Sequence, residues 1–258
     1  MNISEFCSRV QGRYWRTVTG LFFKRSLKMN NSHPYITFTF DDFPVSALHK
    51  GGEILRRFGL HATYYASLGL MGTKSPVGTI FVPDDIKELV KQGHELGCHT
   101  FAHCHSLETS PKVFEDSIIE NQQALDKIAP GVKFKSFSYP ISGPRLDTKR
   151  RVGKHFRCSR GGGQTYNVGM ADLNYLKAFF IEKSRDDPSF IREIIDQNCR
   201  ARGWLIFATH DISETPSAFG CTPSFFEDIV RYSLASGATI LPVTEALDAI
   251  VKPLGAYR

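Results

Sequence analysis

Short apolar stretches of strand character alternate with stretches of helical character from Tyr35 to the end of the chain. This alternation is typical of βαβ units, in which parallel strands are joined by crossover helices. The predicted strands are Tyr35–Phe40, Ala62–Ala66, His94–His99, Phe134–Tyr139, His155–Cys158, Tyr175–Ile181, Leu205–Thr209 and Thr239–Pro242. The predicted helices are Val45–Phe58, Asp84–Gln92, Pro111–Ile128, Arg145–Lys154, Pro188–Arg202, Pro223–Ala235 and Thr244–Val251. About eight strands favour closure into a (β/α) barrel.

One unit of this pattern is irregular. The segment Ser159–Asn174, "SRGGGQTYNVGMADLN", shows no helical periodicity, so its unit is predicted to lack a helix. We therefore expect an α/β fold, a single irregular (β/α) barrel of seven to eight parallel strands over residues 33–258. A chain of 258 residues fits one such barrel. Residues 1–32 are predicted to form a basic, helical N-terminal extension.

The net charge of +6 is concentrated partly in that extension. Six basic residues against one acidic residue fall within the first 28 positions, and no nucleic-acid-binding motif accompanies them, so no nucleic-acid partner is predicted. Residues 5–28 are expected either to pack on the domain or to lie on a membrane as a basic amphipathic helix. No stretch approaches the roughly 20 apolar residues of a membrane span, and no secretory signal is recognised. The expected location is cytoplasmic, with peripheral contact at the inner membrane face as the alternative.

Polar residues follow several predicted strands at their carboxyl ends, where active sites of such folds lie. They are Asp41 and Asp42, His99 and His103, Tyr139 and Pro140, and His210 and Asp211. Two histidines four residues apart, joined by a carboxylate from another strand, form a common catalytic zinc set. Two adjacent carboxylates repel each other, so a metal on one and a proton-transfer role for the other would explain both.

Each of these residues also has a simpler interpretation. The two aspartates could cap the helix that follows Pro44, and both can reach one site only if the strand ends or bulges there. His210 follows a strongly apolar strand, where a general acid, a third metal ligand and a hydrogen-bonded core histidine all remain open.

Four segments, in this order, resemble the motifs of polysaccharide deacetylases with the NodB homology domain, carbohydrate esterase family 4. They are "TFDD" at 39–42, "HTFAH" at 99–103, "FSYP" at 137–140 and "THD" at 209–211. The resemblance covers roughly residues 34–251. It implies a distorted barrel that removes acetyl groups with one divalent metal ion. It further implies that Asp42, His99 and His103 bind the metal, that Asp41 is the general base and that His210 is the general acid.

The sequence departs from the family pattern in its third and fourth motifs. The third motif usually contains an arginine that pairs with the catalytic aspartate, but Ser138 and Tyr139 occupy that region here. The fourth motif, an acidic residue near a tryptophan, has no clear counterpart, and Asp172 is the candidate. Substrate contacts are expected from Tyr139, Pro140 and Arg160, with a backbone N–H near Tyr139 completing an oxyanion site.

The predicted function is metal-dependent removal of N-acetyl or O-acetyl groups from an amino-sugar-containing saccharide or glycolipid. Zinc suits the two histidines and one carboxylate, and cobalt, nickel, manganese or iron could occupy the same ligands. The alternatives are a related amidase that opens cyclic ureides or imides, and a non-catalytic saccharide-binding relative.

Overall fold

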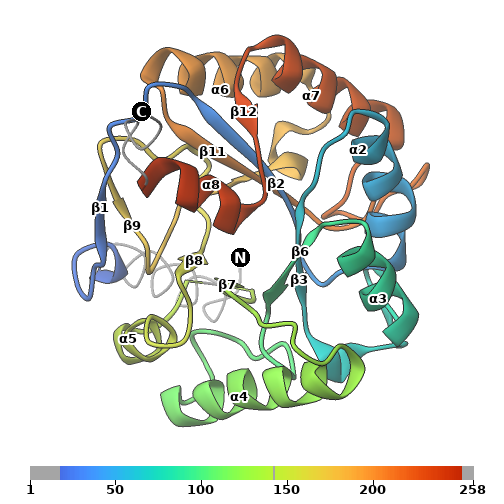
Figure 1. The fold of residues 1–258 in the computed structure, drawn as a ribbon, viewed down its shortest axis with the longest axis vertical. Helices are drawn as coiled ribbons and strands as arrows, with labels where there is room; N and C mark the ends of the chain where they lie inside the picture. The colour runs from blue at the N-terminus through green and yellow to red at the C-terminus, as the bar shows by residue number, and fades with distance from the viewer. Residues whose placement is uncertain (1–17, 142, 252–258) are drawn as a thin grey trace, which may run out of the picture.

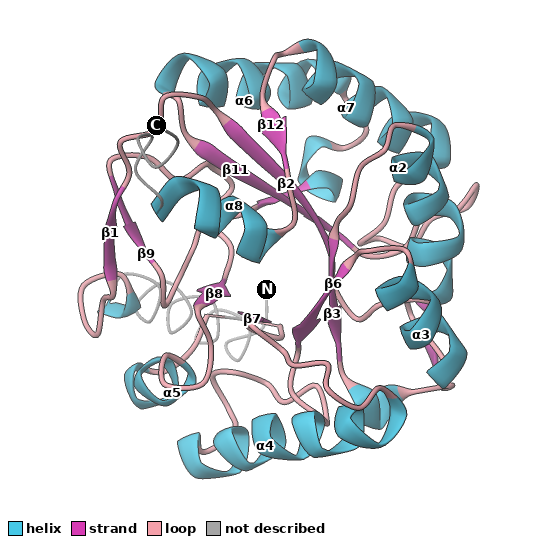
Figure 2. Ribbon diagram, viewed as in Figure 1, coloured by secondary structure: helices cyan, strands magenta, loops and turns pink. Residues whose placement is uncertain are grey.

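A computed structural model describes residues 18–141 and 143–251. Seven parallel strands form a curled sheet in the order β10-β11-β2-β3-β6-β7-β8, and β12 pairs with β2 (Figures 1 and 2). Their bounds are β2 Tyr35–Phe40, β3 Thr63–Ala66, β6 Glu95–Cys98, β7 Ser136–Ser138, β8 Cys158–Arg160, β10 Phe179–Phe180, β11 Trp204–Thr209 and β12 Thr239–Ile240. Two small antiparallel pairs join β1 (Ser26–Lys28) to β9 (Met170–Asp172) and β4 (Lys74–Ser75) to β5 (Gly78–Thr79). The predicted irregular barrel is confirmed.

The barrel is incomplete on one side. In the described part of the chain, β8 and the segment before β10 form no continuous strand pairing; they are joined by an isolated bridge from Arg160 to Leu176 and by backbone hydrogen bonds such as Ser159 N to Leu173 O at 2.7 Å. The last strand, β12, pairs with the beginning of β2, whereas β3 pairs with its end. The eighth predicted strand therefore lies beside the same edge of β2 as β3 does, and it does not close the barrel.

Helices α2 to α7 surround the sheet (Figure 1). They are α2 Glu53–Arg57, α3 Pro83–Lys91, α4 Pro111–Ile128, α5 Leu146–Val152, α6 Pro188–Ala201 and α7 Pro223–Ala235; a π-helical turn, η1 (Ala47–Gly52), precedes α2, and η2 (Leu68–Leu70) and η3 (Ile181–Ser184) are 3₁₀ turns. The bounds of α4 and α7 were predicted correctly. In both, a hydroxyl side chain (Ser110 or Thr222) caps the helix, and a proline at the first position fixes its start.

The last helix, α8 (Val243–Val251), closes the amino-terminal end of the barrel. Its first amide groups donate hydrogen bonds to the first residues of two strands, Val243 N to Thr63 Oγ1 at 2.9 Å and Thr244 N to Glu95 Oε2 at 2.9 Å. Its buried face packs on Trp204, Ile206 and other inward residues of the sheet. Because this end is plugged, the carboxyl-terminal strand ends at the opposite side are the accessible ones.

The N-terminal segment is joined to the domain by a strand, and the predicted helix is wrong for residues 20–28. β1 pairs with β9 in the register Ser26 to Asp172. The buried Lys149 ammonium donates to the carbonyl oxygens of Thr19 (2.6 Å) and Phe22 (2.8 Å) and pairs with Asp172 at 2.5 Å. Residues 5–17 of the predicted helix lie outside the described residues. A helix long and apolar enough to cross a membrane is absent from residues 18–141 and 143–251, and membrane contact stays a prediction.

A buried histidine beside β6 makes stability depend on pH. His94 accepts a hydrogen bond from Ala62 N at 3.1 Å, and burial lowers the pKa of His94 to about 4. The unfolded chain has a histidine pKa of about 6.5, so this stability is complete above that pH and is lost as pH falls toward 4. We expect the loss from this group to reach about 2–3 kcal/mol at pH 4.5.

Urea unfolding of the wild type and of His94→Gln at pH 7.5 and pH 4.5 checks this expectation. The wild type should lose more free energy of unfolding between the two pH values than the variant loses. Equal losses would show that His94 does not carry the pH dependence.

Candidate active site

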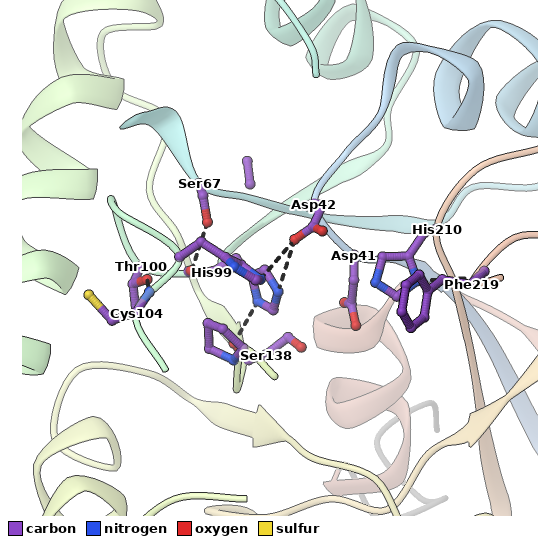
Figure 3. A network of polar contacts seen from close by, with 12 residues as sticks. Asp41, Asp42, Ser67, His99, Thr100, Cys104, Ser138, His210 and Phe219 are labelled. Atoms are coloured by element: carbon purple, nitrogen blue, oxygen red, sulfur yellow. Dashed lines mark hydrogen bonds and ion pairs between the residues drawn. The ribbon is translucent and has the colours of Figure 1, made fainter. Parts of the chain in front are cut away.

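Two carboxylates stand side by side where β2 ends. Asp41 continues the strand, since its backbone N–H donates to Thr209 O of β11 at 2.9 Å. Asp42 then adopts a left-handed conformation with φ +60°, and Phe43 follows with φ +49°. Such backbone costs about 1–3 kcal/mol per non-glycine residue and persists only where its surroundings enforce it. Because the strand ends here, the side chains of Asp41 and Asp42 can face one site although the two residues are neighbours in sequence (Figure 3).

Asp42, His99 and His103 form a compact group with one donor atom each, and these atoms all lie within 4.8 Å of one another. The Asp42 Oδ1 atom lies 3.5 Å from His99 Nε2 and 3.1 Å from His103 Nε2. It is buried, and no group in the described part of the chain gives it a well-formed hydrogen bond. Two imidazoles and one carboxylate converging on one point fit a divalent cation with open positions for water and substrate.

The surroundings of His99 and His103 set the orientation of the first ring and the pKa values of both. The Nδ1 atom of His99 is 2.8 Å from Ser138 O, which directs Nε2 toward Asp42. Burial lowers the pKa of His99 to about 4 and leaves its ring neutral, the form that binds metals. His103 has a left-handed backbone with φ +49°; burial opposes its protonation, but Asp42 raises its pKa overall. Two of the three candidate ligands, Asp42 and His103, thus have a left-handed backbone.

Asp41 has a different partner. The guanidinium of Arg160, at the end of β8, forms an ion pair with Asp41 Oδ1, and the two side chains are 1% and 6% exposed. Burial alone would raise the pKa of Asp41, but Arg160 and the nearby histidines outweigh it and lower the pKa. Asp41 is therefore kept ionised without being one of the metal-ligand group.

Arg160, predicted as a substrate contact, is buried in the structure. Its guanidinium lies over the rings of Tyr65 (5.1 Å) and Phe180 (5.6 Å) and is paired with Asp41.

His210 lies on the other side of Asp41 from the candidate ligands (Figure 3). It is half-buried, and its ring packs near Phe219, with Nδ1 3.3 Å from Phe219 O. Burial raises the pKa values of both Asp41 and Asp42, and His210 is among the neighbours that lower them. His210 is thus a half-buried polar group near Asp41.

Glu182 joins this group and was missed by the sequence analysis. It lies in η3, directly after β10; burial raises its pKa, and His210 acts against that rise. Its Oε2 atom is buried and has no hydrogen bond within residues 18–141 and 143–251. Glu182 directly follows the predicted strand Tyr175–Ile181, so a search of every strand end for acidic residues would have found it.

Other predicted residues are engaged elsewhere. Tyr139 is buried, and its backbone N–H donates to Arg160 O at 3.0 Å, so this N–H is not free to bind an oxyanion. The carbonyl of Pro140 accepts a hydrogen bond from Ser106 Oγ at 2.9 Å. Asp211 holds its own loop through Ser217 N at 2.9 Å. Asp172, the candidate for the fourth motif, pairs with Lys149 away from the site.

The sequence matches the polysaccharide deacetylase family over residues 28–156, half of the chain, and the chain belongs to that family. It is also 26% identical over 98 residues to a peptidoglycan-N-acetylglucosamine deacetylase from Bacillus cereus. That match covers 38% of this chain and 42% of the relative, so the chain spans less than half of the relative's length.

Solved structures share the fold at low sequence identity. A family 4 carbohydrate esterase from Streptomyces lividans, in complex with acetate, superposes with a TM-score of 0.57 at 18% identity and covers 82% of this chain and 92% of its own. A pseudoenzyme of the same esterase family from Bacillus anthracis gives 0.60 at 14% identity, with 85% and 67% covered. The fold is therefore that of the family, and it is shared by active and inactive proteins.

The candidate ligands can be tested by metal content. His99→Ala removes one of three donors and leaves Asp42 and His103, so we expect stoichiometric binding of divalent metal to be lost. His105→Ala is the matched control, because this nearby histidine accepts hydrogen bonds from Leu107 N and Glu108 N and is outside the ligand group.

Elemental analysis of both purified variants after loading with zinc measures the effect. Retention of one metal ion per chain by His99→Ala would contradict the assignment.

Proposed function

We propose that this protein is a metal-dependent hydrolase that removes N-acetyl, or O-acetyl, groups from an amino-sugar-containing saccharide or glycolipid. One observation carries the proposal. Asp41, ionised by its pairing with Arg160, lies between the candidate metal ligands and His210 but is not itself one of those ligands. A binding protein would need neither a separate base nor an acid facing it. Family membership supports the same reaction class.

The chain's own residues would divide the reaction between them. A divalent cation held by Asp42, His99 and His103 supplies Lewis acidity toward the acetyl carbonyl and a water molecule. Asp41 accepts a proton from the water as its oxygen bonds to the carbonyl carbon. His210 donates a proton to the amide nitrogen as the carbon–nitrogen bond breaks, which releases acetate and a free amine. His210 thus makes the amine a better leaving group.

Zinc is the proposed metal. Its preference for imidazole and carboxylate donors fits the ligands, and the neutral state of His99 needs no proton to be displaced. Cobalt, nickel, manganese and iron remain alternatives that bind the same donors.

The amino-sugar substrate is proposed by analogy with the relative that acts on peptidoglycan N-acetylglucosamine. A related amidase that opens cyclic ureides or imides is the alternative enzyme. The two differ in product: only the deacetylase releases acetate. A non-catalytic relative, like the pseudoenzyme among the structural matches, is disfavoured by the presence of both Asp41 and His210.

An acetate-release screen tests the proposed reaction. Zinc-loaded protein should release acetate from at least one N-acetylated oligosaccharide or glycolipid, and a chelator should abolish the release. Hydrolysis confined to cyclic amides, with no acetate from any saccharide, would overturn the proposal.

The base is tested with the same assay. Asp41→Asn removes the proton acceptor and should lower kcat by about 10²–10⁴-fold, with metal content unchanged because Asp41 is not a ligand. Unchanged turnover in this variant would show that another group is the base.

A further inference from the structure

The partner of the base comes from an unexpected strand. Ser138, where the family resemblance leads one to expect an arginine, is the last residue of β7, and Arg160 is the last residue of β8. These two residues are paired directly in the register of the two parallel strands. We propose that Arg160 is the positioning residue of the catalytic base Asp41, and that β8 supplies the cation that β7 lacks. This inference rests on the proposed function.

The register makes the exchange geometrically simple. Adjacent strands lie about 4.8 Å apart, and residues paired in parallel strands point to the same face of the sheet. An arginine on either strand can therefore reach the same carboxylate with its long side chain. Ser138 does not compete for this task, because its hydroxyl is buried and forms no hydrogen bond in the described part of the chain.

The surroundings of Arg160 favour one fixed arrangement. Its guanidinium is flanked by Tyr65 and Phe180, and its Nη1 donates to Gly161 O at 3.2 Å. Asp41 is the one carboxylate that forms an ion pair with it among the residues described. A buried arginine is costly to desolvate, so this pair is weak as a stabilising device and better explained as a means of orienting its partner.

The contact also selects which oxygen of Asp41 does the chemistry. Arg160 binds Oδ1. Oδ2 is then the oxygen that accepts the proton from water, and the ion pair prevents the carboxylate from rotating or from joining Asp42 in the metal-ligand group. Arg160 thus acts through Asp41 and touches neither substrate nor water.

A charge-relocation experiment tests this role. Acetate release is measured for the zinc-loaded wild type, Arg160→Ser, Arg160→Lys and the double variant Ser138→Arg/Arg160→Ser. Arg160→Ser should lower kcat about 100-fold with KM within threefold, because the base is disoriented while substrate contacts remain. The kcat of Arg160→Lys should lie between those of Arg160→Ser and the wild type. The double variant should have a kcat at least tenfold higher than that of Arg160→Ser, a recovery that a purely structural role for Arg160 would not produce.

Matched controls separate folding from positioning. Metal content and thermal unfolding are recorded for every variant, and Arg192→Ser removes another arginine that lies over a tyrosine ring, Tyr232, away from the site; it should leave kcat unchanged. If Arg160→Ser does not fold, Arg160→Lys and the double variant carry the test.

Each outcome decides a different claim. If the wild type is active and Arg160→Ser has the same kcat, the positioning role alone is overturned. A folded, metal-loaded double variant whose kcat is no higher than that of Arg160→Ser would also overturn it. A wild type that released no acetate from any substrate would overturn the proposed function, and this inference with it.

Discussion

Two ionised carboxylates next to each other at the end of β2 are the constraint around which the site is built. Side by side and largely withdrawn from water, they would repel each other and take up protons. The structure gives each its own partner: the guanidinium of Arg160 for Asp41, and the imidazoles of His99 and His103 for Asp42. The left-handed backbone of Asp42 separates the two side chains into these environments. Under the proposed function, the two carboxylates then have different chemical tasks.

The fold concentrates this polar group at one end of the barrel. Helix α8 seals the amino-terminal end through hydrogen bonds to Thr63 and Glu95. The interior is filled with apolar side chains, Trp204 and Leu247 among them. The carboxyl-terminal strand ends are then the place where Asp41, His99 and Arg160, from three different strands, can meet substrate or one another.

Local patterns in the sequence were sufficient for most of the fold. Tyr35–Phe40, Pro111–Ile128 and Pro223–Ala235 agree with the structure residue for residue, because apolar runs, caps and N-terminal prolines are local signals. The pairing of β1 with β9 and of β12 with β2 could not be read in this way, since register between distant strands leaves no local mark. The same reason explains why the helix predicted for the N-terminal extension, residues 1–32, is absent from residues 20–28, where β1 lies instead.

The site residues show the same difference between local signals, which can be read from the sequence, and long-range contacts, which cannot. Asp41, Asp42, His99, His103 and His210 could be found because each follows a recognisable strand. Arg160 was predicted only as a substrate contact, because its ion pair with Asp41 joins positions 119 residues apart along the chain. Glu182 was missed although it follows a predicted strand. A partner supplied by a neighbouring strand becomes visible only when the strand order is known.

The central claim, that the two aspartates have separate tasks, is tested most directly by a crystal structure of the protein soaked with a divalent metal ion and measured by anomalous scattering at the absorption edge of that metal. The account predicts one anomalous peak bound by Asp42, His99 and His103, with Asp41 still paired to Arg160. A peak bound by both aspartates, with the contact between Asp41 and Arg160 broken, would contradict it.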